Sequence, residues 1–141
     1  MTFELHPQLA ADSVVLGCFE LSLLLLSNDA NYPWCILVPQ REDVREIYGL
    51  DAADRRQLLD ESVQLGRAMM AACGGDKLNV AALGNVVPQL HLHHIVRYEN
   101  DPAWPAPVWG LVPARAYETA EREMRVAALH ACLGTGYRPA G

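Results

Sequence analysis

The sequence predicts an α+β fold, with an antiparallel sheet of about five strands, a long helix packed on one face and a helix at the C-terminus. Short β-rich runs separated by turn residues fill the first part of the chain and recur after residue 76. Between them lies one long segment with apolar residues at helical spacing. A chain of 141 residues is long enough to bury such a core as one domain, 1–141.

The N-terminal part is predicted to form a short helix and then three strands, at 6–11, 13–19, 20–26 and 34–38 respectively. Pro7 suits the first turn of a helix. The Asn, Asp and Pro residues of 27–33 favour a loop that joins two antiparallel strands. The third strand is nearly all apolar and ends at Pro39, which is typical of a central strand buried on both faces.

A long helix is predicted from Asp51 to the glycine pair 74–75, after a polar run at 40–48 that can hold a helical turn. Asp51 can cap the helix, and Asp54 is placed for its first turn. Glycine commonly follows the last turn of a helix. The stripe expected to face the core contains Leu58, Leu65, Met69 and Ala72, flanked by Leu59, Val63 and Met70.

The C-terminal part is predicted to contain two strands, a loop and a helix, at 77–83, 88–97, 99–110 and 114–133. Residues 84–87 form the turn between the strands. The loop contains Trp104 and Trp109, which are expected to anchor it. One small, apolar face of the last helix could pack on the domain or on a second subunit; it contains Tyr117, Ala120, Met124, Ala127, Ala128 and Ala131.

Composition excludes several classes of partner. The net charge of −6 opposes non-specific binding to a nucleic acid backbone. No apolar run, the four leucines of 23–26 included, is long enough to cross a bilayer, and no signal peptide is expected. The cysteines, which lack the spacing of a zinc site, are predicted to be reduced, buried side chains of a cytoplasmic protein: Cys18, Cys35, Cys73 and Cys132.

Three of the five histidines fall within residues 91–94. Apolar residues alternate through this run, which is the period of a half-buried strand. Gln89, His91 and His93 should therefore share one face, while His94 falls on the apolar face and is expected to be structural. A neutral imidazole is a nucleophile, a base and a metal ligand. Two histidines on one face favour a functional site over exposed side chains that have no role.

The run resembles the signature of the histidine triad (HIT) family of nucleotide hydrolases and transferases, His-φ-His-φ-His-φ-φ with φ apolar, on a strand after a Gly-rich turn. Placing Arg97 at the basic residue that often follows the motif puts Gln89, His91 and His93 at the three histidine positions. Gly84 and Asn85 then match a glycine and a polar phosphate contact. Starting the triad at His91 loses the matches at 84 and 97. The resemblance covers a motif core at 14–98, and 99–141 completes the domain.

The chain departs from the family at two positions, since Gln89 replaces the first histidine and Trp34 stands where the family has a fourth. The resemblance implies that His91 attacks the α-phosphate of a nucleotide and forms a nucleotidyl-histidine intermediate. It implies that His93 stabilises the charge that develops on phosphate. Gln89 can bond to phosphate or leaving group but cannot supply a proton.

The resemblance also implies nucleotide or phosphate contacts elsewhere in the chain, from Asn85, Asn28, Trp34 and Arg97. Asn28 is the candidate for ribose hydroxyls. Trp34 is interpreted as a packing residue or as a platform for a base. A solvated surface position is the alternative for Arg97.

The activity that the resemblance implies is hydrolysis or nucleotidyl transfer. Without an acid at position 89, a dinucleoside polyphosphate is favoured over a phosphoramidate, because a polyphosphate leaves with less protonation. A cytoplasmic homodimer is expected, with no cofactor apart from Mg²⁺ that can accompany the nucleotide.

Two other functions stay open. One is a nucleotide-binding protein with little turnover. The other is a His-x-His metal-dependent enzyme, which needs a further ligand. His6, His94 and His130 lack diagnostic spacing for that ligand, so no metal site is expected.

Overall fold

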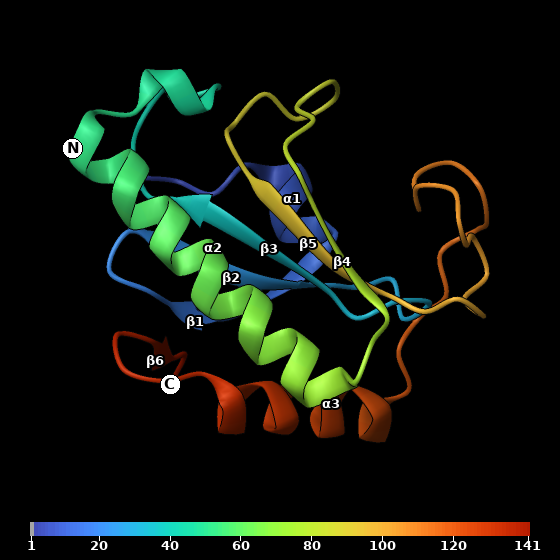
Figure 1. The fold of residues 1–141 in the computed structure, drawn as a ribbon. Helices are drawn as coiled ribbons and strands as arrows, with labels where there is room; N and C mark the ends of the chain where they lie inside the picture. Colours follow the sequence, from blue (N-terminus) through green and yellow to red (C-terminus); the bar gives the residue numbers. More distant parts are fainter. Residues whose placement is uncertain (1) are drawn as a thin grey trace.

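The computed structural model describes residues 2–141, which form an antiparallel sheet with helices packed around it (Figure 1). Within these residues the sheet has six strands in the order β4-β5-β3-β2-β1-β6. In chain order the elements are α1 (Pro7–Ala11), β1 (Ser13–Cys18), β2 (Ser22–Ser27), β3 (Trp34–Pro39), the 3-10 turn η1 (Ile47–Gly49), α2 (Ala52–Cys73), β4 (Lys77–Ala81), β5 (Leu92–Arg97), α3 (Thr119–Cys132) and β6 (Arg138–Pro139). The predicted α+β class, long helix and C-terminal helix are confirmed.

The long helix α2 begins and ends as the sequence predicts. The Asp51 carboxylate accepts the Asp54 backbone N–H at 2.8 Å, which satisfies one of the free donors of the first turn. Gly74 ends the helix with a φ of 62°, a left-handed conformation that favours glycine. Leu65 and Met69 face the core, whereas Leu59 is 64% exposed. The exposed side of α2 therefore keeps apolar side chains.

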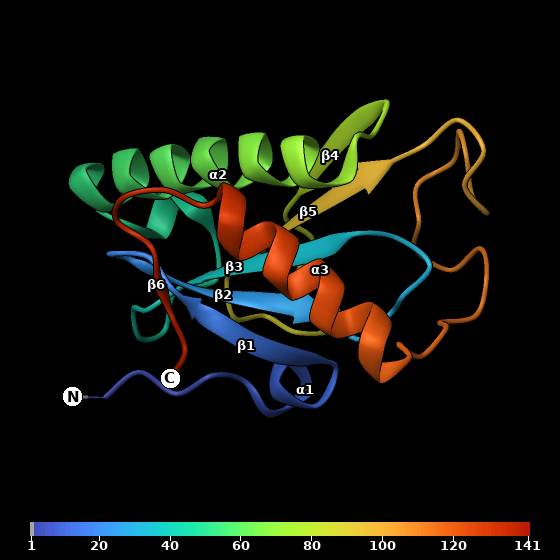
Figure 2. The same ribbon diagram turned by 90° about the horizontal axis from the view of Figure 1, so that it is seen from below.

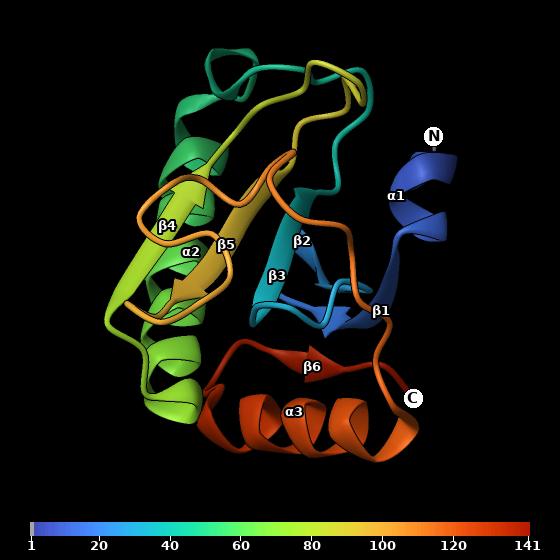
Figure 3. The same cartoon turned by 90° about the vertical axis from the view of Figure 1, so that its right-hand side faces the viewer.

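The sheet is covered on both faces, by different parts of the chain. Figure 3 shows α2 on one side of the sheet and α1 on the other. The larger core lies under α2 and α3 and includes Leu24, Cys35, Leu37, Leu65, Leu92, Val96 and Leu129. A smaller cluster on the other face includes Leu9, Leu25, Ile36, Val38 and Val87, with Phe3, Leu5 and Trp34 at its border. The N-terminal segment thus shields the face that α2 leaves free.

The C-terminal helix α3 differs from the prediction in its start and in the face that packs. It begins at Thr119, where Glu118 and Glu121 form a capping box. Figure 2 shows α3 beside α2. The packed face contains Leu129, with Val126 and Leu133 at its border. On the predicted small-residue face, Tyr117 packs against the same core, whereas Ala120, Ala127, Ala131 and Met124 are exposed, Met124 to 73%. Most of this face therefore does not pack on the domain, and its packing on a second subunit stays a prediction.

The strand that carries the histidines is shorter than predicted. It starts at Leu92, and residues 88–91 approach it as irregular backbone. Pro88 has no N–H to give to a ladder. The Leu90 N–H donates to the Val44 carbonyl, at 2.9 Å, outside the sheet. The segment before β5 is therefore held by the connection between β3 and α2.

The structure also bears on the expectations for the cysteines and for membrane-spanning segments. The four cysteines are free, but only Cys35 is fully buried and Cys132 is exposed, which corrects the prediction for that residue. Across residues 2–141, no helix combines the length and the apolar character needed to cross a membrane.

Candidate active site

His91 and His93 lie together on the sheet face opposite α2. His93 pairs across the sheet with Ile36 of β3, and Ile36 packs in the cluster that contains Leu9 of α1. His91 precedes His93 by two residues and points the same way. The centroids of the two rings are 4.8 Å apart. The structure thus brings together the two histidines that the sequence predicts to share a face.

One hydrogen bond sets the proton on the His91 ring. Its Nδ1 lies 2.7 Å from the backbone carbonyl oxygen of Gln89. A carbonyl oxygen can only accept, so Nδ1 carries the proton and donates it. In the neutral ring, Nε2 then keeps its lone pair. His91 can therefore offer Nε2 as a nucleophile.

The His93 ring is held in the opposite tautomer. The Trp34 indole Nε1–H donates to Nδ1 of His93 at 3.0 Å. An indole N–H can only donate, so Nδ1 keeps its lone pair and Nε2 carries the proton. Burial, and then the charges that His91 and His94 can carry, lower the pKa of His93 to about 3. At neutral pH this ring is an uncharged N–H donor.

The two rings therefore supply complementary groups, a lone pair on Nε2 of His91 and an N–H on Nε2 of His93. A lone pair is what a nucleophile needs, and an N–H stabilises an oxygen that gains negative charge. The pair is suited to attack on an electrophilic centre that carries an anionic oxygen.

His94 has the structural position that the sequence assigns to it. It is completely buried beneath α2, where the Ser62 hydroxyl donates to its Nε2 at 2.7 Å. Its Nδ1 lies 3.2 Å from the Leu92 carbonyl. Burial lowers its pKa to about 4, against the opposing effect of the bond to Leu92. Because β5 lies between β3 and β4, His94 is in the interior of the sheet and not at its edge.

Ser62 is a residue that the sequence analysis missed. It lies four residues after Leu58 and three before Leu65, so its hydroxyl faces the core. A buried hydroxyl requires a partner. A polar residue within the apolar stripe of α2, together with a histidine on the apolar face of β5, is the signal that could have predicted this contact.

Aromatic side chains form the wall beside His93. The ring centroid of Trp109 lies 5.1 Å from that of His93, and the Trp34 centroid lies 5.6 Å from it, both edge-on. Trp109 remains 37% exposed, so it lies at the border between the site and solvent. It was expected to anchor its loop. Its nearness to the histidines depends on the fold of that loop, which no local sequence signal indicates.

Arg97 holds that loop through internal hydrogen bonds. It is 2% exposed, and its guanidinium binds Asp101 at 2.8 Å, Asn79 at 2.9 Å and the Ala106 carbonyl at 2.8 Å. A group with four internal hydrogen bonds has little left for a ligand. The burial of Arg97 shows that the alternative of a solvated surface residue is wrong, while its predicted contact with phosphate stays a prediction. Arg97 is a buried clamp for the 99–110 loop.

Gln89 is tied to the N-terminal segment. Its amide oxygen accepts the His6 backbone N–H at 2.8 Å, and its amide nitrogen donates to the Glu4 carbonyl at 2.9 Å. Both ends of the amide are used in these bonds. In this structure Gln89 thus secures the N-terminal arm, residues 2–6, beside the site, and its predicted contact with phosphate or leaving group stays a prediction.

The two asparagines lie in different surroundings. Asn85 is exposed and follows Gly84, whose φ of 78° turns the chain. Val87 in the same turn packs with Ile36, so this turn borders the face of the two histidines. Asn28 lies in the loop between β2 and β3, where its side chain donates to the Ala11 carbonyl at 3.3 Å. The structure places Asn85, but not Asn28, in the turn beside the pair.

Metal-binding side chains do not gather in this region. Among residues 2–141, no group of three or more His, Cys, Asp or Glu side chains could hold a metal ion. Moreover, the lone pair of the His93 ring is on Nδ1, and that atom already accepts the Trp34 indole N–H. The two rings therefore do not offer paired lone pairs to one ion.

Comparison with known proteins identifies close structural relatives. The HIT domain family matches residues 8–100. A histidine triad protein from Bradyrhizobium japonicum has 42% sequence identity and a TM-score of 0.94, with 95% of this chain and 100% of that one covered. One from Marinobacter aquaeolei has 52% identity and a TM-score of 0.91, with coverage of 94% and 97%. One from Sinorhizobium meliloti has 39% identity and a TM-score of 0.91, with coverage of 93% and 97%. No curated protein matches the sequence.

The two buried neutral rings predict a pH-dependent stability. The pKa of His93 is about 3 and that of His94 about 4, whereas an unfolded histidine titrates near 6.5. Between these values the unfolded chain binds more protons, so the free energy of unfolding falls as the pH drops from 6.5 toward 4. We expect a loss of about 2 kcal/mol or more between pH 7 and pH 5 in urea unfolding.

Residue-specific NMR titration checks the source of this loss. The ring signals of His93 and His94 should stay those of neutral imidazole down to pH 5. Ring signals that titrate near pH 6.5, or a free energy of unfolding that does not change over this range, contradict the assignment.

Proposed function

Because this chain belongs to the HIT domain family, whose members are generally nucleotide-binding hydrolases or transferases, we propose that it cleaves a nucleotide at the α-phosphate through a nucleotidyl-histidine intermediate on His91. The observation that supports this most strongly is the pair of opposite tautomers. Gln89 holds the proton on Nδ1 of His91 and Trp34 keeps it off Nδ1 of His93. A nucleophile and a donor are therefore ready before substrate arrives.

In the first step, Nε2 of His91 attacks the α-phosphorus in line with the leaving group. A nitrogen–phosphorus bond forms, and the bond from phosphorus to the leaving oxygen breaks with its electron pair on that oxygen. The ring becomes cationic and remains bonded to the Gln89 carbonyl through Nδ1–H. That bond stabilises the ring while it carries positive charge.

In the second step, water or another acceptor attacks phosphorus. The nitrogen–phosphorus bond breaks, its electron pair returns to Nε2, and the proton of the attacking water passes to solvent. Nε2–H of His93 donates to a non-bridging oxygen in both steps, where negative charge builds up. The exposed amide of Asn85 is proposed as a second phosphate contact, because its turn borders the same face. Asn28 is retained as a candidate for the ribose, since its loop leads into Trp34.

The substrate proposed is a dinucleoside polyphosphate or a related phosphoanhydride. No ionisable side chain stands at position 89, and the Gln89 amide is bonded to Glu4 and His6. A leaving amine or alkoxide needs a proton, whereas a polyphosphate leaves well as an anion. The proposal requires no cofactor held by the protein, and Mg²⁺ would arrive with the nucleotide.

The proposed nucleotidyl-histidine intermediate should be detectable directly. Wild-type protein mixed with diadenosine tetraphosphate and quenched in alkali should carry an adenylyl group on His91, detected by peptide mass spectrometry. His91→Ala should show no adduct and lose more than about a thousandfold in kcat, because the nucleophile is absent. His130→Ala, which changes a histidine paired with Tyr137 outside the site, should retain the adduct. Binding without adduct or product supports a nucleotide-binding protein instead.

The rate of cleavage should depend on whether the leaving group needs a proton. Wild-type protein should cleave diadenosine tetraphosphate faster than adenosine phosphoramidate, with rates measured by chromatography of the products. Gln89→His restores an ionisable group at the first triad position and should raise phosphoramidate cleavage relative to tetraphosphate cleavage. Faster cleavage of the phosphoramidate by wild-type protein contradicts the proposed substrate class.

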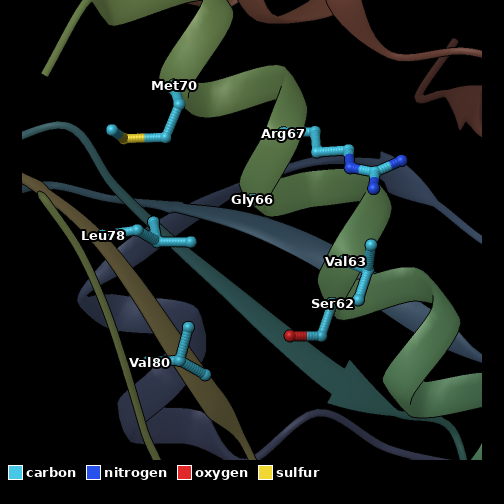
Figure 4. Close-up of a pocket in the computed structure, with 7 residues that line it drawn as sticks. All are labelled: Ser62, Val63, Gly66, Arg67, Met70, Leu78 and Val80. Atoms are coloured by element: carbon cyan, nitrogen blue, oxygen red, sulfur yellow. The ribbon is translucent and has the colours of Figure 1, made fainter.

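We also propose that two copies of the chain associate through α2 and β4. The strand β4 lies at one edge of the sheet, and the backbone groups on its outer side can pair with another strand. Beside it lies a hollow of about 360 Å³ between α2 and β4 (Figure 4), lined by Ser62, Val63, Gly66, Arg67, Met70, Leu78 and Val80. Val63 and Val80 are 46% and 49% exposed there. A two-fold axis along this edge would cover both on each copy.

Light scattering after size exclusion tests the association. Wild-type protein should elute with twice the mass of the chain, and Val80→Glu should give the mass of a monomer because charge then enters an apolar interface. Val15→Glu is the matched control, since Val15 is 46% exposed on β1 and lies far from β4 in the strand order. A monomeric wild-type protein, or an equal effect of both substitutions, contradicts this interface.

A further inference from the structure

We propose that Trp34 is a positioning residue that fixes His93 as an N–H donor toward phosphate. This inference rests on the proposed function and assigns Trp34 a role that packing or base stacking does not include. The Trp34 indole N–H donates to Nδ1 of His93 at 3.0 Å. Across residues 2–141 this is the only hydrogen bond to the His93 ring, so no other contact selects its tautomer.

The sheet itself brings the two side chains together. Trp34 is the first residue of β3 and pairs with Ile95, while His93 pairs with Ile36. Trp34 and His93 are therefore diagonal neighbours on one face, at a separation that aromatic side chains can bridge. The indole is held from its other sides by Trp109, at 5.7 Å and 89°, and by Tyr32, at 6.4 Å and 66°. Its N–H is thus aimed by packing before any substrate binds.

The nitrogen that carries the proton decides whether His93 attracts or repels a phosphate oxygen. A neutral imidazole can carry its proton on either nitrogen. With the proton on Nε2, the ring donates to a phosphate oxygen. With the proton on Nδ1, it presents a lone pair to an anionic oxygen, which is repulsive and leaves a buried donor facing the indole N–H.

Tryptophan fixes this choice more strictly than a histidine in the same position would. A histidine can donate or accept, and it titrates near neutral pH. An indole N–H only donates and keeps its proton throughout the physiological range. The tautomer of His93 should therefore be independent of pH down to its own pKa of about 3. The replacement of the fourth family histidine by Trp34 would then keep a ring in place and remove its ability to titrate.

The experiment compares Trp34→Phe with Trp109→Phe. The first keeps an aromatic ring but removes the donor to Nδ1. The second changes a ring whose centroid is closer to that of His93, at 5.1 Å against 5.6 Å for Trp34, and that forms no hydrogen bond with it in this structure. Long-range ¹⁵N–¹H NMR on protein labelled in its histidines reports the tautomer of each ring without substrate.

In wild-type protein and in Trp109→Phe, His93 should show an unprotonated Nδ1 and a protonated Nε2. In Trp34→Phe, the two ¹⁵N signals should move toward the average of both tautomers, and protonation of His93 should begin at higher pH. The kcat/KM for diadenosine tetraphosphate should fall roughly fivefold to tenfold, the usual effect of one lost hydrogen bond. Trp34→His should restore part of this loss at pH 8, because a neutral imidazole can turn one N–H toward Nδ1 of His93.

A double-mutant cycle separates positioning from packing. If Trp34 acts through His93, Trp34→Phe should have little further effect on kcat/KM in a His93→Ala background. An undiminished effect there overturns the inference, as does a wild-type His93 protonated on Nδ1 or a tautomer that Trp34→Phe leaves unchanged. These spectra decide the role of Trp34 even if no adduct forms on His91, which would contradict the proposed function alone.

Discussion

The antiparallel pairing of β3 with β5 is the constraint on which the site depends. It places Ile36 opposite His93 and Cys35 opposite His94, so two neighbouring histidines stand on opposite faces of one strand. A slip of one residue would put His93 beneath α2 and His94 beside Trp34. The apolar residues that flank them, Leu92 and Val96, are buried with α2 and resist that slip. The core thus fixes the register, and the register fixes the site.

The same strand shows two ways to bury an uncharged imidazole. His94 has a partner on each nitrogen, the Ser62 hydroxyl and the Leu92 carbonyl, so its ring is satisfied and inert. His93 has a partner on Nδ1 alone. Its Nε2–H is left for a ligand, as is the Nε2 lone pair of His91. Burial keeps the rings neutral, and the choice of partner decides whether a neutral ring is structural or chemically available.

Segments distant in sequence complete the surroundings of the pair. The N-terminal arm is secured by the two hydrogen bonds of Gln89, and its Phe3 and Leu5 border the same cluster as Ile36. The 99–110 loop is held by the buried Arg97–Asp101 ion pair, which lets Trp109 approach His93. Two residues of the motif region that were expected to contact substrate thus hold the walls of the site. Both positions are polar side chains with fixed internal partners, which makes the walls rigid.

Local patterns in the sequence predicted the fold class, the limits of α2 and the shared face of His91 and His93, because helix caps and strand alternation are local properties of the chain. They also indicated that His94 is structural. The hydrogen-bond partners of Arg97 and Gln89 could not be predicted in this way, since they lie elsewhere in the chain or in the fold of a loop. The tautomers of the two histidines could not be predicted from local sequence either, because the donor to His93 comes from Trp34, fifty-nine residues away along the chain. A hydrogen bond across a sheet depends on register, and register is a property of the folded core.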